Sequence, residues 1–339
     1  MGRSLVTIDL GAIRRNAATL LRALDGAELW AVVKADGYGH GAADVGAAAL
    51  QAGATALCVA TLPEALALRA ALGAVRTIVM GPASSDAIAT AREAGIELVV
   101  ADGKIPDGVR VHLKLDTGMG RWGLSEVPAP TRDVVGLMSH FATADCDAAF
   151  SEKQIERFRV ATAEFPQLTR HLANSAGVLR YPAAAFDAAR CGIALYGLSP
   201  FGESPAADGL EPALRWDSEL AQIKLLQPGE STGYGRRFVA ERPTWIGIVP
   251  VGYADGFRRN LTGTEVRVAD EPRRVVGTVS MDAFAVELDR DLPVGTPVTL
   301  IGPGVEADAH ARVAGTIGYE LVTGLSRSAE RTQRVVVDR

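Results

Sequence analysis

Up to about residue 200, the chain repeats one pattern: a short apolar run, a polar turn, and an alanine-rich segment with helical spacing. The strand-like runs are 29–33, 56–60, 76–80, 96–100, 109–115, 134–138, 168–172 and, least clearly, 187–191. Strands that alternate with helices indicate a parallel sheet, and eight such units predict a closed (β/α)8 barrel of the TIM type. A doubly wound open sheet is the alternative, and the number of runs favours the barrel.

Two connections in this pattern are too short for an outer helix. Only residues 101–108 separate the fourth and fifth runs, and the stretch 124–133 before the sixth run contains Pro128 and Pro130. Parallel neighbours normally need a crossover of a dozen or more residues. Eight extended residues reach about 26 Å, enough to return along a strand of about 17 Å but not while forming a helix. We therefore expect the barrel helices after the fourth and fifth strands to be missing or vestigial.

The composition of the chain changes after Ser199. The stretch 200–212 is rich in Pro, Gly and Ala and is typical of a linker, and short β-rich segments separated by turn signals follow it. These segments predict a mostly antiparallel β domain. The opening SLVTIDL is also strand-like, and we expect it to pack with this domain. The predicted organisation is therefore an N-terminal strand at 1–10, a barrel at 11–210 and a β domain at 211–339.

The charge and the cysteines narrow the class of protein. The net charge is −5 and both signs are scattered along the chain, which gives no reason to expect nucleic acid or a membrane surface as a partner. No signal peptide is recognisable and no apolar run is long enough to span a bilayer. The three cysteines lie far apart, so we expect no disulfide framework, no metal site and a cytoplasmic location.

Cationic and polar side chains follow the predicted strands at the end where barrel enzymes carry their active sites. Lys34 follows the first strand, Lys114 and Arg121 the fifth, His140 the sixth and Arg190 the eighth. The loops NSAG and CGI follow the seventh and eighth strands, the usual phosphate position in this fold. Clustered cations lower the pKa of a lysine and make it nucleophilic, and we expect Arg121, Arg190 and His140 to be such cations.

A nucleophilic lysine that faces a phosphate site suggests a Schiff base with pyridoxal phosphate, which carries both an aldehyde and a phosphate. The alternative is that Lys34 is an ordinary strand-end lysine that reaches water. His112 and His171 alternate within their strand runs, and we assign them to the core or to a supporting layer.

The motifs AVVKADGYGHG, HLKLDTGMGRWG, SHFATAD, ANSAG, ARCGIALYGL, TGYGRRF, VGYADG, SMDAF and IGYEL occur in this order along nearly the whole chain. Together they resemble the signature of alanine racemases, pyridoxal-phosphate enzymes that interconvert L- and D-alanine. The resemblance implies a barrel followed by a β domain, and a homodimer in which each active site receives residues from the partner's β domain. It also implies a role in supplying D-alanine for peptidoglycan.

The resemblance assigns roles to individual residues. Lys34 matches the lysine that binds the cofactor covalently and acts as one base, and Tyr234 matches the opposite base, contributed across the dimer. The remaining cofactor-binding positions are matched by Tyr38, His140, Ser175, Arg190, Gly192, Ile193 and Tyr319. Arg121 and Met281 match residues that hold the substrate carboxylate, and Lys114 matches a lysine that is carbamylated in several family members.

The sequence departs from its relatives at Thr278, Ser280 and Ala283, where the family often has a basic residue, a cysteine and an amide residue. These changes affect the expected charge of the substrate entryway and leave both bases in place. Tyr253 and Tyr319, which narrow the site, are retained and favour a side chain as small as that of alanine. Two other functions compete: a decarboxylase of similar architecture, and a carrier of pyridoxal phosphate, which would resemble the barrel alone.

Overall fold

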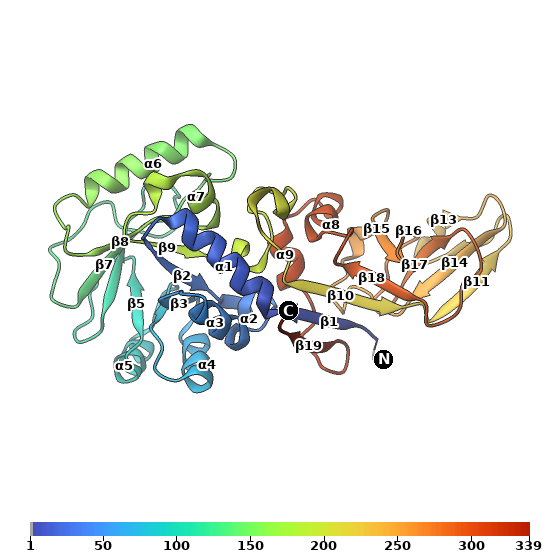
Figure 1. Cartoon of the computed structure of the whole chain (residues 1–339), viewed down its shortest axis with the longest axis horizontal. Coiled ribbons are helices and arrows are strands. Elements are labelled where there is room, and N and C mark those ends of the chain that lie inside the picture. Colours follow the sequence, from blue (N-terminus) through green and yellow to red (C-terminus); the bar gives the residue numbers. More distant parts are fainter. Residues whose placement is uncertain (1–2) are drawn as a thin grey trace. The chain divides into compact units, whose positions relative to one another are not determined.

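The computed structural model describes residues 3–339 and divides the chain into two compact units (Figure 1). One unit comprises Gly11–Glu211. The other joins the N-terminal segment up to Leu10 with Pro212–Arg339. Within the described residues, no helix is both long and apolar enough to cross a membrane.

The first unit is a closed barrel of parallel strands, so the predicted barrel is confirmed and the open sheet is wrong. Around the barrel the strands are β2 (Glu28–Val32), β3 (Ala56–Val59), β4 (Thr77–Val79), β5 (Glu97–Val100), β6 (Val111–Lys114), β7 (Val134–Met138), β8 (Thr169–His171) and β9 (Ala188–Cys191). β9 pairs with β2 and closes the ring. Every residue of β3, β5, β6 and β9 is buried, as expected for strands covered on both faces.

The helices of this unit are α1 (Leu10–Leu24), α2 (Lys34–Tyr38), α3 (Ala42–Gln51), α4 (Leu62–Leu72), α5 (Ser85–Ala94), α6 (Ala148–Ala161) and α7 (Ser175–Arg180), with 3-10 turns η1 (Pro182–Ala184), η2 (Ile193–Tyr196) and η3 (Pro205–Asp208). A capping box between Thr61 and Glu64 starts α4, and the Ser84 hydroxyl caps α5. No helix connects β5 to β6 or β6 to β7 in this described part of the chain (Figure 1), so the expected absence of two barrel helices is confirmed.

The second unit is built on a nine-stranded sheet in the order β11-β14-β17-β16-β15-β18-β10-β1-β19. Its strands are β1 (Leu5–Asp9), β10 (Leu214–Glu219), β11 (Gln222–Leu226), β14 (Thr244–Val249), β15 (Glu265–Val268), β16 (Glu271–Val276), β17 (Phe284–Leu288), β18 (Pro297–Ile301) and β19 (Gln333–Val337). Only the β1–β19 pair is parallel, which confirms a mostly antiparallel domain.

Short elements complete the second unit: the ribbon of β12 (Ser231–Thr232) and β13 (Phe238–Val239), the helices α8 (Ala307–Ala314) and α9 (Gly318–Thr323), and the 3-10 turns η4 (Tyr234–Arg236) and η5 (Arg259–Leu261). The N-terminal strand β1 lies between β10 and β19 and belongs to this sheet, although it is more than 200 residues from β10 in sequence.

Candidate active site

Lys34 lies directly beyond the C-terminal end of β2, where the chain turns into α2. Four consecutive residues, from Ala35 to Tyr38, have positive φ angles of 52° to 61°, a region that residues other than glycine rarely adopt. The turn is held in part by the backbone N–H of Ala35, which donates to Glu64 Oε1 over 2.7 Å. Left-handed backbone of this kind costs free energy and clusters at functional sites, so the residues after Lys34 are held in a fixed, strained conformation.

The amine of Lys34 is less basic than that of an ordinary lysine. Burial lowers its pKa, and the positive charges of Arg121 and Arg190 lower it further. His140 adds no charge, because burial and the neighbouring Arg190 hold its pKa well below 6.5. The sequence-based view of His140 as one of the clustered cations is therefore wrong, since a buried imidazole beside a guanidinium stays neutral.

Arg190 on β9 is almost fully buried and holds together three strand ends. Its Nη1 donates to His171 Nδ1 (2.7 Å) and to the His171 carbonyl (2.8 Å). Its Nη2 donates to the carbonyls of Ser139 (2.7 Å) and Leu172 (3.2 Å) and to His140 Nδ1 (3.2 Å). Among the described residues, no hydrogen-bond acceptor engages its Nε–H. Burial lowers the pKa of Arg190 to about 10, so the group remains a cation at neutral pH.

The ends of β2, β8 and β9 form a cradle around Gly192. The Ser175 hydroxyl, at the start of α7, accepts the backbone N–H groups of Gly192 (3.1 Å) and Ala194 (3.3 Å). A Cβ atom on Gly192 would lie 2.4 Å from the Tyr38 hydroxyl, so only glycine lets that phenol approach. The structure thus brings together Tyr38, Ser175, Gly192 and Ile193, four of the predicted cofactor-binding residues.

The loop after β6 carries Arg121, and Lys114 ends that strand. The side chains of both lie over the Trp122 ring, with Lys114 Nζ 5.4 Å and Arg121 Cζ 5.0 Å from its centroid. Burial, and then the charge of Arg121, lower the pKa of Lys114 to about 8. Asp116 shapes the loop, because its Oδ1 accepts the backbone N–H groups of residues 118–120.

In the second unit, three predicted site residues lie on neighbouring loops. Tyr234 is 72% exposed on η4, and its carbonyl accepts the Thr278 hydroxyl (2.9 Å). Tyr253 is 43% and Met281 52% exposed. The backbone N–H of Tyr253 donates to the Ser280 carbonyl (3.1 Å), which joins the loop VGYADG to the loop SMDAF. All three side chains are therefore accessible to a partner or a ligand.

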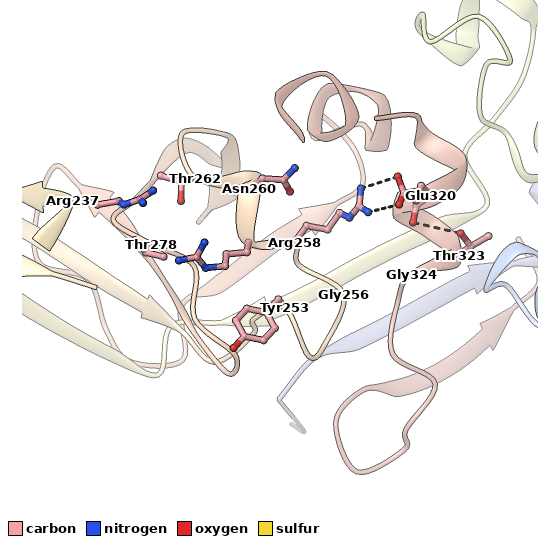
Figure 2. A pocket seen from close by; sticks show the side chains of 11 residues that line it. Arg237, Tyr253, Gly256, Arg258, Asn260, Thr262, Thr278, Glu320, Thr323 and Gly324 are labelled. Atoms are coloured by element: carbon pink, nitrogen blue, oxygen red, sulfur yellow. Dashed lines mark hydrogen bonds and ion pairs between the residues drawn. The ribbon is translucent and has the colours of Figure 1, made fainter. Parts of the chain in front are cut away.

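The same unit contains a cavity of about 770 Å³ (Figure 2). Residues that line it include Arg237, Arg258, Arg259, Asn260, Tyr253, Thr278 and Glu320. Arg258 forms an ion pair with Glu320 on α9. Tyr319, the residue before Glu320, is half-buried, and its carbonyl accepts the Thr323 hydroxyl (2.7 Å). Thr278 stands where the family often has a basic residue. The positive charge that lines this cavity therefore comes from other positions, namely Arg237, Arg258 and Arg259.

The sequence did not indicate that Glu97 is connected to the site, although hydrogen bonds link it through two histidines to Arg190. His112 Nε2 lies 2.8 Å from Glu97 Oε2, and His112 Nδ1 lies 2.9 Å from His171 Nε2, which in turn connects to Arg190. The only sequence signal is that Glu97 is a charged residue at the start of an otherwise apolar strand. Within the described residues, no group of three or more acidic, histidine or cysteine side chains is arranged to hold a metal ion.

Acid is expected to destabilise the barrel in two stages. The buried His112, His140 and His171 have lowered pKa values, so below about pH 6.5 protons bind them in the unfolded chain and stability falls. Burial alone would raise the pKa of Glu97, but hydrogen bonds from His112 and Arg76 lower it to about 2. Its contribution is complete above about pH 4.3 and is lost as the pH falls towards 2. Urea midpoints measured from pH 7 to pH 3 should fall in both ranges, and a constant midpoint would contradict this assignment.

Barrel and site together define a class of protein: a barrel enzyme with a lysine of lowered pKa at the end of one strand, a cradle of backbone N–H and hydroxyl groups at the end of the neighbouring strand, and a separate β domain. Comparison with known proteins specifies the family. The family model described as "Alanine racemase, N-terminal domain" matches residues 8–200, and that of "Alanine racemase, C-terminal domain" matches residues 213–334. The chain belongs to the alanine racemase family, whose members are pyridoxal-phosphate-dependent isomerases.

Individual relatives agree over nearly the full length of the chain. The chain is 40% identical to alanine racemase of Lactiplantibacillus plantarum, covering 98% of this chain and 97% of the relative. It is 39% identical to alanine racemase 1 of Bacillus subtilis, covering 96% and 91%. The crystal structure of alanine racemase from E. faecalis superimposes with a TM-score of 0.91 at 35% identity, covering 99% of this chain and 98% of that one.

Proposed function

We propose that this chain interconverts L- and D-alanine, with pyridoxal phosphate held at the barrel mouth and with two bases, Lys34 and Tyr234, on opposite faces of the substrate. The observation that carries the proposal is the half-buried Lys34, whose pKa is lowered by burial and by nearby arginines that include Arg190, on the strand next to the Gly192 cradle. Related structures support the ligands: one from Bartonella henselae carries covalently bound pyridoxal phosphate, and one from Bacillus anthracis carries bound L-Ala-P.

The residues at the barrel mouth fit the cofactor. Tyr38, Ser175, Gly192 and Ile193 would hold its phosphate, together with Tyr319, and the unengaged Nε–H of Arg190 would face its pyridine nitrogen. When bound, the cofactor supplies an aldehyde for the lysine and a conjugated ring that takes up electron density from the α-carbon. His140, neutral and hydrogen-bonded to Arg190, holds that guanidinium in place.

Racemisation removes a proton from one face of the α-carbon and returns one to the other face. A base must be close to the proton and must be largely unprotonated. The lowered pKa of Lys34 favours the unprotonated amine on one face. We assign the other face to Tyr234, whose exposed phenol is available to a second subunit in a homodimer with shared sites. Arg121 and the backbone N–H of Met281 would hold the substrate carboxylate, and Tyr253 and Tyr319 would limit the size of the side chain.

Lys114 has the properties of a lysine that reacts with carbon dioxide. Its pKa of about 8 leaves an appreciable neutral fraction near pH 7.5, and a neutral amine is the form that adds to carbon dioxide to give a carbamate. The product would be an anion beside Arg121, where it would fix the guanidinium that holds the substrate carboxylate.

Arg190→Glu is expected to raise the transamination side reaction. Arginine almost never gives up its proton, so Arg190 beside the pyridine nitrogen would leave that nitrogen unprotonated and the ring a weak electron sink. A carboxylate there would favour the protonated ring, stabilise carbanion charge and permit protonation at the wrong carbon. The measurement is pyruvate formed per racemisation turnover in the variant and the unmodified protein. An unchanged ratio would count against this role for Arg190.

The proposal is tested by the loss of optical rotation from L-alanine with purified protein loaded with pyridoxal phosphate. Product analysis separates the alternatives, since a decarboxylase would release an amine and a carrier would release nothing. The β domain with Tyr234 and the family relationship disfavour both alternatives. We place the activity in the cytoplasm, in the supply of D-alanine for peptidoglycan.

A further inference from the structure

A chain of hydrogen bonds runs through the inside of the barrel from Arg190 to Glu97. Arg190 Nη1 contacts His171 Nδ1 over 2.7 Å, His171 Nε2 contacts His112 Nδ1 over 2.9 Å, and His112 Nε2 contacts Glu97 Oε2 over 2.8 Å. The two histidines are fully buried, and Arg190 and Glu97 are 3% and 1% exposed. The chain begins near the C-terminal end of β9 and ends at the first residue of β5, so it joins the two ends of the barrel.

The two end groups fix the direction of every hydrogen bond in this chain. A guanidinium only donates and a carboxylate only accepts. His171 must therefore accept at Nδ1 and donate from Nε2, and His112 must do the same. Both imidazoles are then neutral with the proton on Nε2, and burial lowers the pKa of each, which favours that neutral form. Hydrogen bonds aligned in one direction polarise and strengthen one another.

The barrel wall is built to let the two histidines meet. His112 is on β6 and His171 on β8, and β7 lies between them. The residue of β7 that pairs with His112 is Gly136. A Cβ atom at Gly136 would lie 2.2 Å from His112 Nδ1, so any side chain there would displace the ring from His171. Trp30 packs against both rings, with centroids 5.5 Å and 4.5 Å away.

Arg190 contacts no carboxylate among the described residues. The titratable groups nearest to it are His171, His140 and the thiols of Cys58 and Cys191, and burial raises the pKa of each thiol to about 12, so none of these groups is an anion. The charge of Arg190 also acts on Lys34 and Lys114, but an amine carries no negative charge. Glu97, two imidazoles away, is the nearest negative charge connected to Arg190 by hydrogen bonds.

Glu97 also contacts Arg76 and Arg110, with N···O distances of 3.1 Å and 3.0 Å. His112, its third partner, is fully buried, whereas both ion pairs are weakened by water or shared. Arg110 is 59% exposed and is screened by water, and Arg76 lies 3.4 Å from a second carboxylate, that of Glu28.

We propose that Glu97 is a positioning residue for the active site: acting through His112 and His171, its carboxylate fixes the proton pattern of the chain and holds Arg190 as an oriented cation. The inference rests on the proposed function for the role of Arg190 towards the cofactor. The hydrogen-bond chain itself can be tested without cofactor.

The first measurement is the tautomer of each histidine, from nitrogen-15 chemical shifts of labelled, cofactor-free protein. The sequence has only five histidines, so the signals can be assigned by single substitutions. His112 and His171 are expected to carry the proton on Nε2 and to stay neutral from pH 6 to pH 9. A proton on Nδ1 of either ring, or a cationic ring, would overturn the chain and hence the proposal.

The second measurement compares Glu97→Gln with Glu28→Gln in cofactor-loaded protein. Glutamine keeps the acceptor for His112 and removes the charge. Glu28→Gln is the matched control, because it also removes a carboxylate from Arg76 but does not touch His112. Losing the Glu97 charge leaves Arg190 less compensated, so nearby groups lose protons more easily. The pH midpoint of the bound cofactor's absorbance change should therefore fall by roughly 0.5 to 1 unit in Glu97→Gln, with little change in the control.

A third variant separates action through the histidines from a purely structural role. In His112→Asn the side chain can still accept from His171 but cannot reach Glu97. In this background Glu97→Gln should shift the midpoint by less than half as much. An equal shift in both backgrounds, or equal shifts in Glu97→Gln and Glu28→Gln, would overturn the proposal. If the tautomers hold while racemisation is absent, the failure lies in the proposed function and not in the chain.

Discussion

Lys34→Ala is expected to reduce racemisation of alanine by at least about 10⁴-fold. Under the proposed function, the variant loses the amine that would bind the cofactor aldehyde and would act as the base on one face of the substrate. Because Lys34 follows the strand and makes no hydrogen bond that closes the barrel, the fold should persist. The measurements are the rate of loss of optical rotation from L-alanine and the near-visible absorbance of the purified protein.

A matched control is Lys153→Ala on α6, which removes an exposed lysine far from the strand ends in sequence. It should keep full activity and the same absorbance. If Lys34→Ala retained more than a few per cent of the activity, a different group would have to hold the cofactor, and the assignment of the barrel mouth as the active site would fail.

Tyr234→Phe is expected to lower racemisation by about 10²- to 10⁴-fold, the usual range for a lost general acid or base. The fold should be unaffected, because the side chain is 72% exposed. Lys34 would still serve its own face of the substrate. Exchange of the α-hydrogen with solvent deuterium should therefore survive for one enantiomer of alanine and be lost for the other. Tyr181→Phe in the barrel unit serves as the control and should exchange both enantiomers.

Mixing the two inactive variants tests whether sites are shared between subunits. A mixed dimer of Lys34→Ala and Tyr234→Phe would contain one site with both changes and one site with neither. We expect such a mixture, after subunit exchange, to regain up to about half the specific activity per mixed dimer. A mixture that stays as inactive as its components would show that Tyr234 does not act in the partner's site.

The sequence predicted the barrel because its signal is local. Each strand is a short apolar run followed by a turn, and the two missing helices follow from the number of residues available at 101–108 and 124–133. The order of the nine-stranded sheet could not be predicted in this way. The parallel pairing of β1 with β19 joins Leu5 to Gln333, and no local pattern indicates which distant strands become neighbours.

The candidate site shows the same difference between residues placed by local sequence signals and contacts that depend on distant parts of the chain. Lys34, Arg190 and Ser175 lie at or shortly after the C-terminal ends of strands, so their gathering at one end of the barrel follows from the fold class. The connection of Arg190 to Glu97 depends on contacts across β7 that only the closed barrel creates, and on the lack of a side chain at Gly136, where the His112 ring packs. The charge state of His140 was predicted wrongly for a related reason: burial decides it, and burial is a property of the packed structure.

The barrel wall at β5 and β6 is covered by loops where the other strands have helices, and Lys114 and Arg121 lie at the end of this wall. Segments that lack packed helices open locally at a lower free energy than the rest of a domain. Within the barrel, we expect fast amide hydrogen exchange in the connections 101–108 and 124–133 and thermal inactivation to begin there, before global melting. Binding of the substrate carboxylate, which we assign to Arg121, would then be the first property of the protein to be lost on warming, while most of the barrel remained folded.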